Sequence, residues 1–127
     1  MRAWLVRAEG DLALARHART LAPEHGWAAA FHAQQAVEKS LKAYLVLVQR
    51  EFPYTHEIDT LIQLCGSPIA SQQDVASAAT LTGFAVAARY PGVAPAPHQA
   101  AEAVLIAERA VVAIRATIVA EGGPRVP

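Results

Sequence analysis

The sequence predicts an all-α fold, an up-and-down four-helix bundle with one additional short helix, on the basis of three observations. First, 54% of the 127 residues are apolar but only 6% are aromatic. The apolar residues are mostly alanine, leucine and valine, which favours closely approaching helices over a sandwich of sheets. Second, apolar positions recur with the period of a helix along several segments. Third, proline and glycine residues lie between these segments and mark their ends.

The chain divides into five expected helices, which cover residues 2–21, 27–50, 57–64, 71–88 and 98–121. The helix at 57–64 is short, and the hydroxyl of Thr55 is placed to cap its first backbone N–H groups. The proline-rich stretch 91–97 forms a stiff connection before the last helix. We therefore expect one helical domain over residues 1–121, followed by a flexible tail over residues 122–127.

The charge and the cysteine content exclude several classes of protein. The formal net charge is zero, so no overall field attracts the chain to nucleic acid or to an anionic membrane, and any phosphate contact must come from a local basic group. Cys65 is the only cysteine. This excludes an internal disulfide framework and a cysteine-rich zinc site, and it is typical of a reducing cytoplasm.

No export signal or membrane anchor is expected. The opening segment lacks the apolar core of a signal peptide, because Arg7, Glu9 and Asp11 interrupt it. The longest uncharged stretch, residues 75–88, is shorter than the roughly 18 residues that a membrane span requires. We therefore expect a cytoplasmic protein.

The expected last helix has two apolar stripes. One is a continuous packing seam with alternating spacings of four and three, formed by Ala100, Val104, Ala107, Val111, Ile114 and Ile118. The second lies on another side of the helix and contains Ala101, Leu105, Val112 and Val119. An isolated four-helix bundle leaves this flank exposed, so we expect a homodimer or a higher homo-oligomer. The alternative is that the short helix or the proline-rich connection covers the flank.

A narrow polar stripe runs along the expected second helix, with His32, Gln35, Lys39 and Lys42 on one line and Glu38 beside them. One interpretation is a solvated face with a Glu38–Lys42 ion pair that contributes a few tenths of a kcal/mol. The other is a surface for phosphate, because two lysines beside an amide and an imidazole suit an anionic backbone or a nucleotide. Composition alone favours the solvated face.

Asp11 is unusual, because helical periodicity places it within the apolar stripe of the first helix. That stripe contains Trp4, Ala8, Leu12, Ala15 and Ala18. An unpaired buried charge is very costly, so we expect the carboxylate to meet Lys39, Lys42 or Arg89 across the bundle. A structural ion pair is the favoured role. The alternative is that Asp11 orients an arginine of an active site.

No metal or cofactor is expected. None of the five histidines forms a ligand pair on one helical turn: His56 has no second histidine four residues on, and His98 has only Glu102. The sequence also lacks a glycine-rich phosphate loop after a strand and a serine in a nucleophile-elbow sequence.

Similarity to a known family is carried by four segments, which are DLALA at 11–15, FHAQQAVEKSLKAYL at 31–45, PYTHEIDTLIQL at 53–64 and ARYP at 88–91. Together they resemble the HEPN domain family, in particular small stand-alone prokaryotic members of the type associated with nucleotidyltransferases. The resemblance implies a helical bundle that dimerises, often beside a small nucleotidyltransferase. It also implies that the bundle binds nucleotide or RNA, or cleaves RNA as a toxin.

We therefore expect Gln35, Lys39, Lys42 and Arg89 to contact a nucleotide or RNA, in the substrate-binding partner of a separate nucleotidyltransferase and within a toxin–antitoxin-like pair. Family members that cleave RNA carry an arginine, four to six further residues and then a histidine. Here Arg89 matches the arginine, but His98 follows only after eight residues, three of them proline. Because the family's spacing is not matched, the sequence favours a non-catalytic binding module over an enzyme.

Two other functions stay open. A metal-independent endoribonuclease toxin would use His98 in general acid–base catalysis and Arg89 to stabilise charge on the phosphate, if the proline-rich connection brings them together. A purely structural dimer module would use the same charged residues in ion pairs.

Overall fold

The computed structural model of the chain describes residues 1–87, 90 and 95–123. Within these ranges the regular structure consists of helices, without a β-strand. The predicted all-α class is therefore confirmed. None of the helices in these ranges is long and apolar enough to cross a membrane.

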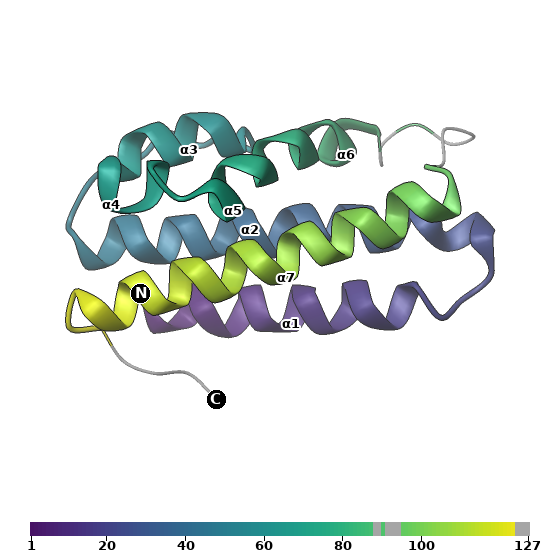
Figure 1. Cartoon of the computed structure of the whole chain (residues 1–127), viewed down its shortest axis with the longest axis horizontal. Coiled ribbons are helices and arrows are strands. Elements are labelled where there is room, and N and C mark those ends of the chain that lie inside the picture. Colours follow the sequence, from purple (N-terminus) through teal and green to yellow (C-terminus); the bar gives the residue numbers. More distant parts are fainter. Residues whose placement is uncertain (88–89, 91–94, 124–127) are drawn as a thin grey trace.

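Three long helices form the frame of the bundle. They are α1 (Arg2–Ala18), α2 (Gly26–Leu47) and α7 (Pro97–Ala120), and the 3-10 helix η1 (Pro23–His25) lies between the first two. In Figure 1, α2 lies behind α7, with α1 along one side and the short helices along the other. The helices approach closely because many fully buried side chains of α2 are small, namely Ala29, Ala30, Ala33, Ala36 and Ala43.

The helix expected at 71–88 is present over residues 73–87 as three consecutive helical segments, in which a 3-10 helix lies between two short α-helices (Figure 1). After α3 (Ile58–Cys65) come α4 (Ser67–Ala70), α5 (Gln73–Ala76), the 3-10 helix η2 (Ser77–Leu81) and α6 (Thr82–Ala87). Gly66, with a φ of 79°, ends α3, and Pro68 lies in the first turn of α4. Gln72 then adopts an extended backbone that separates α4 from α5.

Side chains beside these breaks bond to backbone groups that the breaks leave free, as Gln72 does to the carbonyl oxygen of Pro68 at 2.6 Å. The guanidinium of Arg50, just after α2, donates to the carbonyl oxygens of Leu64 and Cys65 at 2.9 and 2.6 Å. Gln72 donates to Thr117 of α7 at 2.8 Å. Terminal carbonyls of a helix require such partners. The bundle therefore has three long helices and a segmented fourth, together with the predicted short helix α3 and the single turn of α4.

The packing seam predicted for α7 is present. Its six residues, Ala100, Val104, Ala107, Val111, Ile114 and Ile118, are all buried. In the second stripe, Leu105 and Val112 are exposed, while Ala101 and Val119 are half-buried. This flank of α7 therefore presents apolar side chains to solvent, as the sequence predicted.

Candidate functional site

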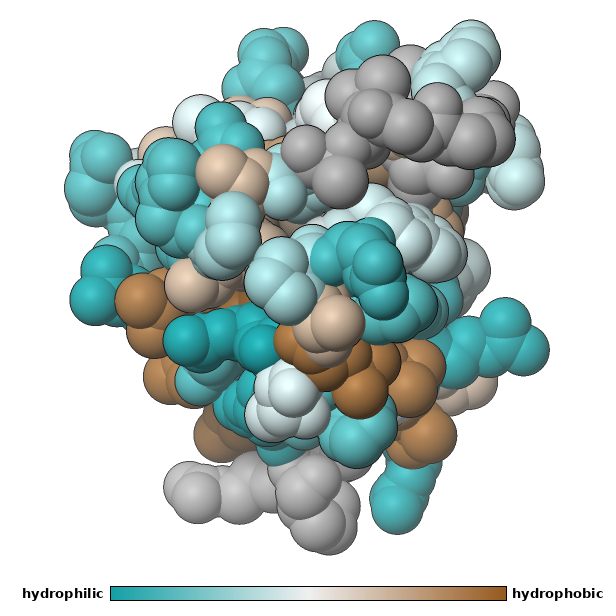
Figure 2. Space-filling model, turned by 90° about the vertical axis from the view of Figure 1, so that its right-hand side faces the viewer, coloured by the Kyte–Doolittle hydropathy of each residue, from teal (hydrophilic) through white to brown (hydrophobic). Residues whose placement is uncertain are grey.

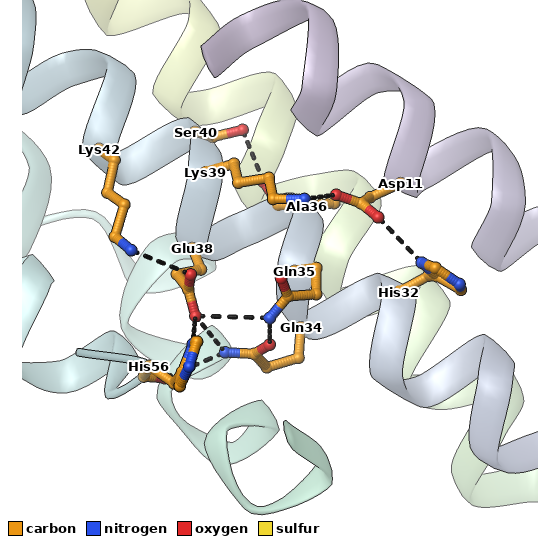
Figure 3. A network of polar contacts seen from close by, with 10 residues as sticks. All are labelled: Asp11, His32, Gln34, Gln35, Ala36, Glu38, Lys39, Ser40, Lys42 and His56. Carbon is orange, nitrogen blue, oxygen red and sulfur yellow. Dashed lines mark hydrogen bonds and ion pairs between the residues drawn. The ribbon is translucent and has the colours of Figure 1, made fainter. Parts of the chain in front are cut away.

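Two buried carboxylates organise the polar side chains of the bundle. Asp11 lies on α1 and Glu38 lies in the middle of α2, and both are less than a tenth exposed. A buried carboxylate requires cations or several hydrogen-bond donors around it. Figure 3 shows that these groups come mainly from α2, together with His56 from the segment before α3.

Asp11 is held by two side chains of α2. Its Oδ2 atom accepts a hydrogen bond from Lys39 Nζ at 2.6 Å, and its Oδ1 atom lies 2.9 Å from Nδ1 of His32. The two partners are seven residues apart, so they lie on one face of α2 and reach the same carboxylate. Lys39 is one of the three cations expected near Asp11. His32 was not expected as a partner, although it lies on the predicted polar stripe.

Glu38 is the centre of a denser cluster (Figure 3). Its Oε2 atom accepts a hydrogen bond from Lys42 Nζ at 3.1 Å, and its Oε1 atom lies 2.9 Å from Nδ1 of His56. Gln34 donates to the same Oε1 atom at 3.1 Å and to the backbone oxygen of His56 at 3.0 Å. Gln35 donates to Gln34 at 2.6 Å. The cluster thus fastens the segment before α3 to the middle of α2.

The Glu38–Lys42 ion pair is buried, which corrects the interpretation of a pair on a solvated face. The two side chains are only 3% and 6% exposed. Three aromatic rings surround the ammonium group, with Nζ 5.4 Å from the ring centre of Trp4, 5.8 Å from Phe52 and 5.9 Å from Tyr54. These rings come from the start of α1 and from the segment after α2, and each attracts the cation. The ammonium of Lys42 is consequently enclosed by the fold.

His32 and His56 each place one ring nitrogen against a carboxylate, while the other ring nitrogen has no such contact in the described part of the chain. Because Nδ1 of His32 and of His56 faces a carboxylate, a neutral ring carries its proton on Nδ1 and leaves Nε2 as an acceptor. Neither Nε2 atom has a hydrogen-bond partner among the residues that the structure describes. The buried carboxylates of Asp11 and Glu38 therefore orient the two imidazoles, and each Nε2 atom can accept a hydrogen bond from a ligand.

The residues predicted to form the site do not all lie together. Gln35, Lys39 and Lys42 share one stretch of α2, whereas His98 is exposed in the first turn of α7. Arg89 lies outside the described residues, so its position relative to Asp11 and His98 stays a prediction.

His98 is distant from the clusters on α2. The start of α7 packs near the start of α2, where a Cβ atom built on Gly26 would lie 3.5 Å from that of Ala100. Lys39 is 13 residues after Gly26, which corresponds to roughly 20 Å along the helix axis. His98 and Lys39 therefore belong to different parts of the surface.

Two shallow hollows lie away from the clusters. One, of about 160 Å³, is at the end of the bundle seen in Figure 2, where hydrophobic side chains alternate with polar ones, and its lining includes Ala18, Arg19, Gly26 and Ala100. The other, of about 360 Å³, is lined by Asp74, Ser77, Thr80, Glu102, Ile106 and Arg109. No group of three or more His, Cys, Asp or Glu side chains is placed to hold a metal ion in the described ranges.

The thiol of Cys65 is not a nucleophile. The residue is fully buried, and burial raises the pKa of its thiol from 9.0 to about 12, although the nearby charge of Arg50 acts in the opposite direction. The reactive form of cysteine is the thiolate. Cys65 therefore acts as a small core residue and contributes no chemistry to the site.

As the pH rises above about 9, the free energy of unfolding should fall more for the parent protein than for a Cys65→Ala variant. The unfolded thiol ionises around pH 9.0 but the folded thiol stays protonated until about pH 12, so the unfolded state gains stability as the pH rises between these values. The difference in free energy of unfolding between the two proteins should shift by roughly 1 kcal/mol by about pH 10. Urea titrations at several pH values measure this shift, and a constant difference would contradict the raised pKa.

Replacing Glu38 by glutamine removes the counter-charge of buried Lys42, so the free energy of unfolding should fall by about 3 kcal/mol. Asp11→Asn is the matched control. Its partner Lys39 is 21% exposed and can turn toward water, so the loss should be about 1 kcal/mol. Glu38→Gln combined with Lys42→Met should recover most of the loss. Urea unfolding measures all three, and an equal loss in the two single variants would contradict the central place of Glu38.

Comparison with known proteins identifies the family to which this helical bundle belongs. The family model described as HEPN domain matches residues 1–123, which span α1 to α7. No curated protein and no solved structure gives a significant match. The runs QQAVEK and THEI, which carried the predicted resemblance, supply Gln34, Gln35, Glu38 and His56 to the Glu38 cluster. The chain belongs to the HEPN domain family.

Proposed function

We propose that this chain binds a nucleotide or RNA through one face of α2 and does not cleave it. HEPN domains are helical modules associated with nucleotides or RNA. The proposed contact surface, here called the α2 polar face, consists of His32, Gln35, Lys39 and His56. Lys42 was expected in this group, but its buried ammonium supports the surface from below instead of contacting the ligand.

The observation that carries this proposal is the difference in exposure between the carboxylates and the donors that they hold. The side chains of Asp11 and Glu38 are 9% and 3% exposed, whereas those of His32, Lys39 and His56 are 28%, 21% and 37% exposed. The negative charges thus lie inside and orient groups that reach solvent. Oriented donors lose little conformational freedom when a ligand binds.

The exposed groups have unused hydrogen-bonding capacity. The ammonium of Lys39 has three N–H donors, and its bond to Asp11 occupies one of them. The Nε2 atoms of His32 and His56 are available as described above. The ammonium can donate to a phosphate oxygen, whereas the acceptor Nε2 atoms of the neutral imidazoles suit N–H and O–H donors on an unpaired base or a ribose. The α2 polar face therefore suits a ligand with both a phosphate and a base.

The α2 polar face is close to neutral together with the carboxylates beneath it, and this limits its affinity for a phosphate. Lys39 and Lys42 are the only lysines in the chain, and each is paired with a carboxylate. A ligand phosphate must therefore compete with Asp11 for Lys39. We expect moderate affinity with a weak dependence on salt, because few counterions are released.

The proposal includes a partner and an oligomeric state. The chain acts as the substrate-binding partner of a separate nucleotidyltransferase, in a toxin–antitoxin-like pair in the cytoplasm, and the family resemblance supports this role. HEPN domains commonly dimerise. The exposed side chains of Leu105 and Val112 on α7 provide an apolar surface for a homodimer or a higher homo-oligomer.

Lys39→Gln should weaken binding of single-stranded RNA about tenfold, because one charged hydrogen bond to phosphate is lost. The slope of log K against log salt concentration should change from about −0.7 to near zero. Arg109→Gln is the matched control, since it removes an exposed cation from α7 and leaves the α2 polar face intact. Fluorescence anisotropy with a labelled strand measures both. Equal losses in the two variants would show that RNA is attracted by charge alone.

RNA incubated with the purified protein in EDTA should stay intact, because the spacing from Arg89 to His98 differs from that of RNA-cleaving members. The variants Arg89→Ala and His98→Ala should then match the parent on a denaturing gel. Cleavage by the parent that is lost in both variants would make the endoribonuclease the better assignment. A protein that retains neither RNA, nucleotide nor nucleotidyltransferase would favour the structural dimer module.

A further inference from the structure

Tyr54 stands beside the α2 polar face with its side chain almost fully in solvent. It is 93% exposed, which is the highest value among the large apolar and aromatic side chains of the described residues. Its ring centre lies 5.7 Å from that of His56, in an edge-to-face arrangement at 70°. The exposed ring therefore adjoins one of the oriented imidazoles.

The backbone around Tyr54 is held on both sides, although the ring itself is exposed to solvent. On one side, Phe52 is half-buried and packs edge-to-face against Trp4 of α1, with ring centres 6.4 Å apart. On the other side, His56 is bonded to Glu38 through its ring and to Gln34 through its carbonyl oxygen. Pro53 further restricts the backbone between them. Tyr54 is thus presented from a fixed segment, so little order has to be imposed before its ring can pack against a ligand.

We propose that Tyr54 is a stacking platform for an unpaired nucleobase whose phosphate contacts the α2 polar face. The inference rests on the proposed function and adds the class of ligand, namely a base that is free of a duplex. Aromatic rings stack on bases of any sequence, and the bases of a double helix are not open to them. Because both lysines of this region are already paired, stacking supplies binding energy that net charge does not.

The test compares three probes and four proteins, with the Lys39→Gln variant described above as a fifth for reference. The probes are a fluorescein-labelled oligoadenylate of roughly 12 nucleotides, the same strand in a duplex, and AMP. The proteins are the parent, Tyr54→Ala, Tyr54→Phe and Trp27→Ala. Trp27 is an exposed aromatic residue at the other end of α2, so its variant controls for the loss of an aromatic side chain. Urea unfolding should give closely similar midpoints for parent and Tyr54→Ala, since Tyr54 is exposed and the nearer rings of Trp4 and Phe52 still face the Lys42 ammonium.

Tyr54→Ala should weaken binding of the single strand about 5- to 150-fold. Tyr54→Phe keeps the ring and should remain within about twofold of the parent, as should Trp27→Ala, because stacking requires the ring and not the hydroxyl. The duplex should bind more weakly than the single strand to the parent. If AMP alone binds and depends on the Tyr54 ring, the stacking stands and a free nucleotide is the source of the base.

Other outcomes overturn the inference and separate it from the proposed function. If Lys39→Gln loses binding but Tyr54→Ala does not, the α2 polar face binds the ligand and the stacking platform is wrong. If the duplex binds as well as the single strand, an unpaired base is not what is recognised. If the parent binds neither RNA nor AMP, both the inference and the proposed function fail.

Discussion

The negative charge of Glu38, which is buried in the middle of α2, must be compensated, and several surrounding side chains provide this compensation. Lys42 supplies the opposite charge, while Gln34 and His56 supply hydrogen bonds. His56 lies in the segment between α2 and α3, so its bond to Glu38 also holds this segment against the middle of α2. A single carboxylate therefore joins the packing of the bundle to the placement of its exposed imidazole.

The sequence predicted correctly those features that depend on the residue spacing within a single helix. The seam of α7 and the position of Asp11 within an apolar stripe follow from the angular spacing along a helix, and no knowledge of neighbouring segments is needed. The same reasoning misplaced Lys42, because a helical wheel cannot show which distant side chains cover a face. Trp4 and Phe52, from separate parts of the chain, surround that ammonium group. The partnership of Glu38 with His56 was missed for the same reason.

The fourth predicted helix shows another limit of periodicity. Its apolar spacing suits a continuous α-helix, yet the structure begins this helical run only at Gln73 and passes through the 3-10 helix η2 in its middle. Side-chain hydroxyls in this stretch bond to nearby carbonyl oxygens, as Ser77 does to Gln73 and Thr80 does to Ser77, which offers the backbone alternatives to a continuous helix. The site was predictable only in part: the sequence located the polar stripe, whereas burial decided which of its members reach solvent.

The restriction of lysine to positions 39 and 42 has a practical consequence for handling the protein. Reagents that couple amines to fluorophores or sensor surfaces find only these two side chains, and Lys42 is enclosed by aromatic rings. Of the two lysines, Lys39 is therefore the accessible one, and acylation there would abolish the charge that offsets Asp11. Immobilisation through lysine amines would thus alter the α2 polar face, so a label is better attached through a residue elsewhere.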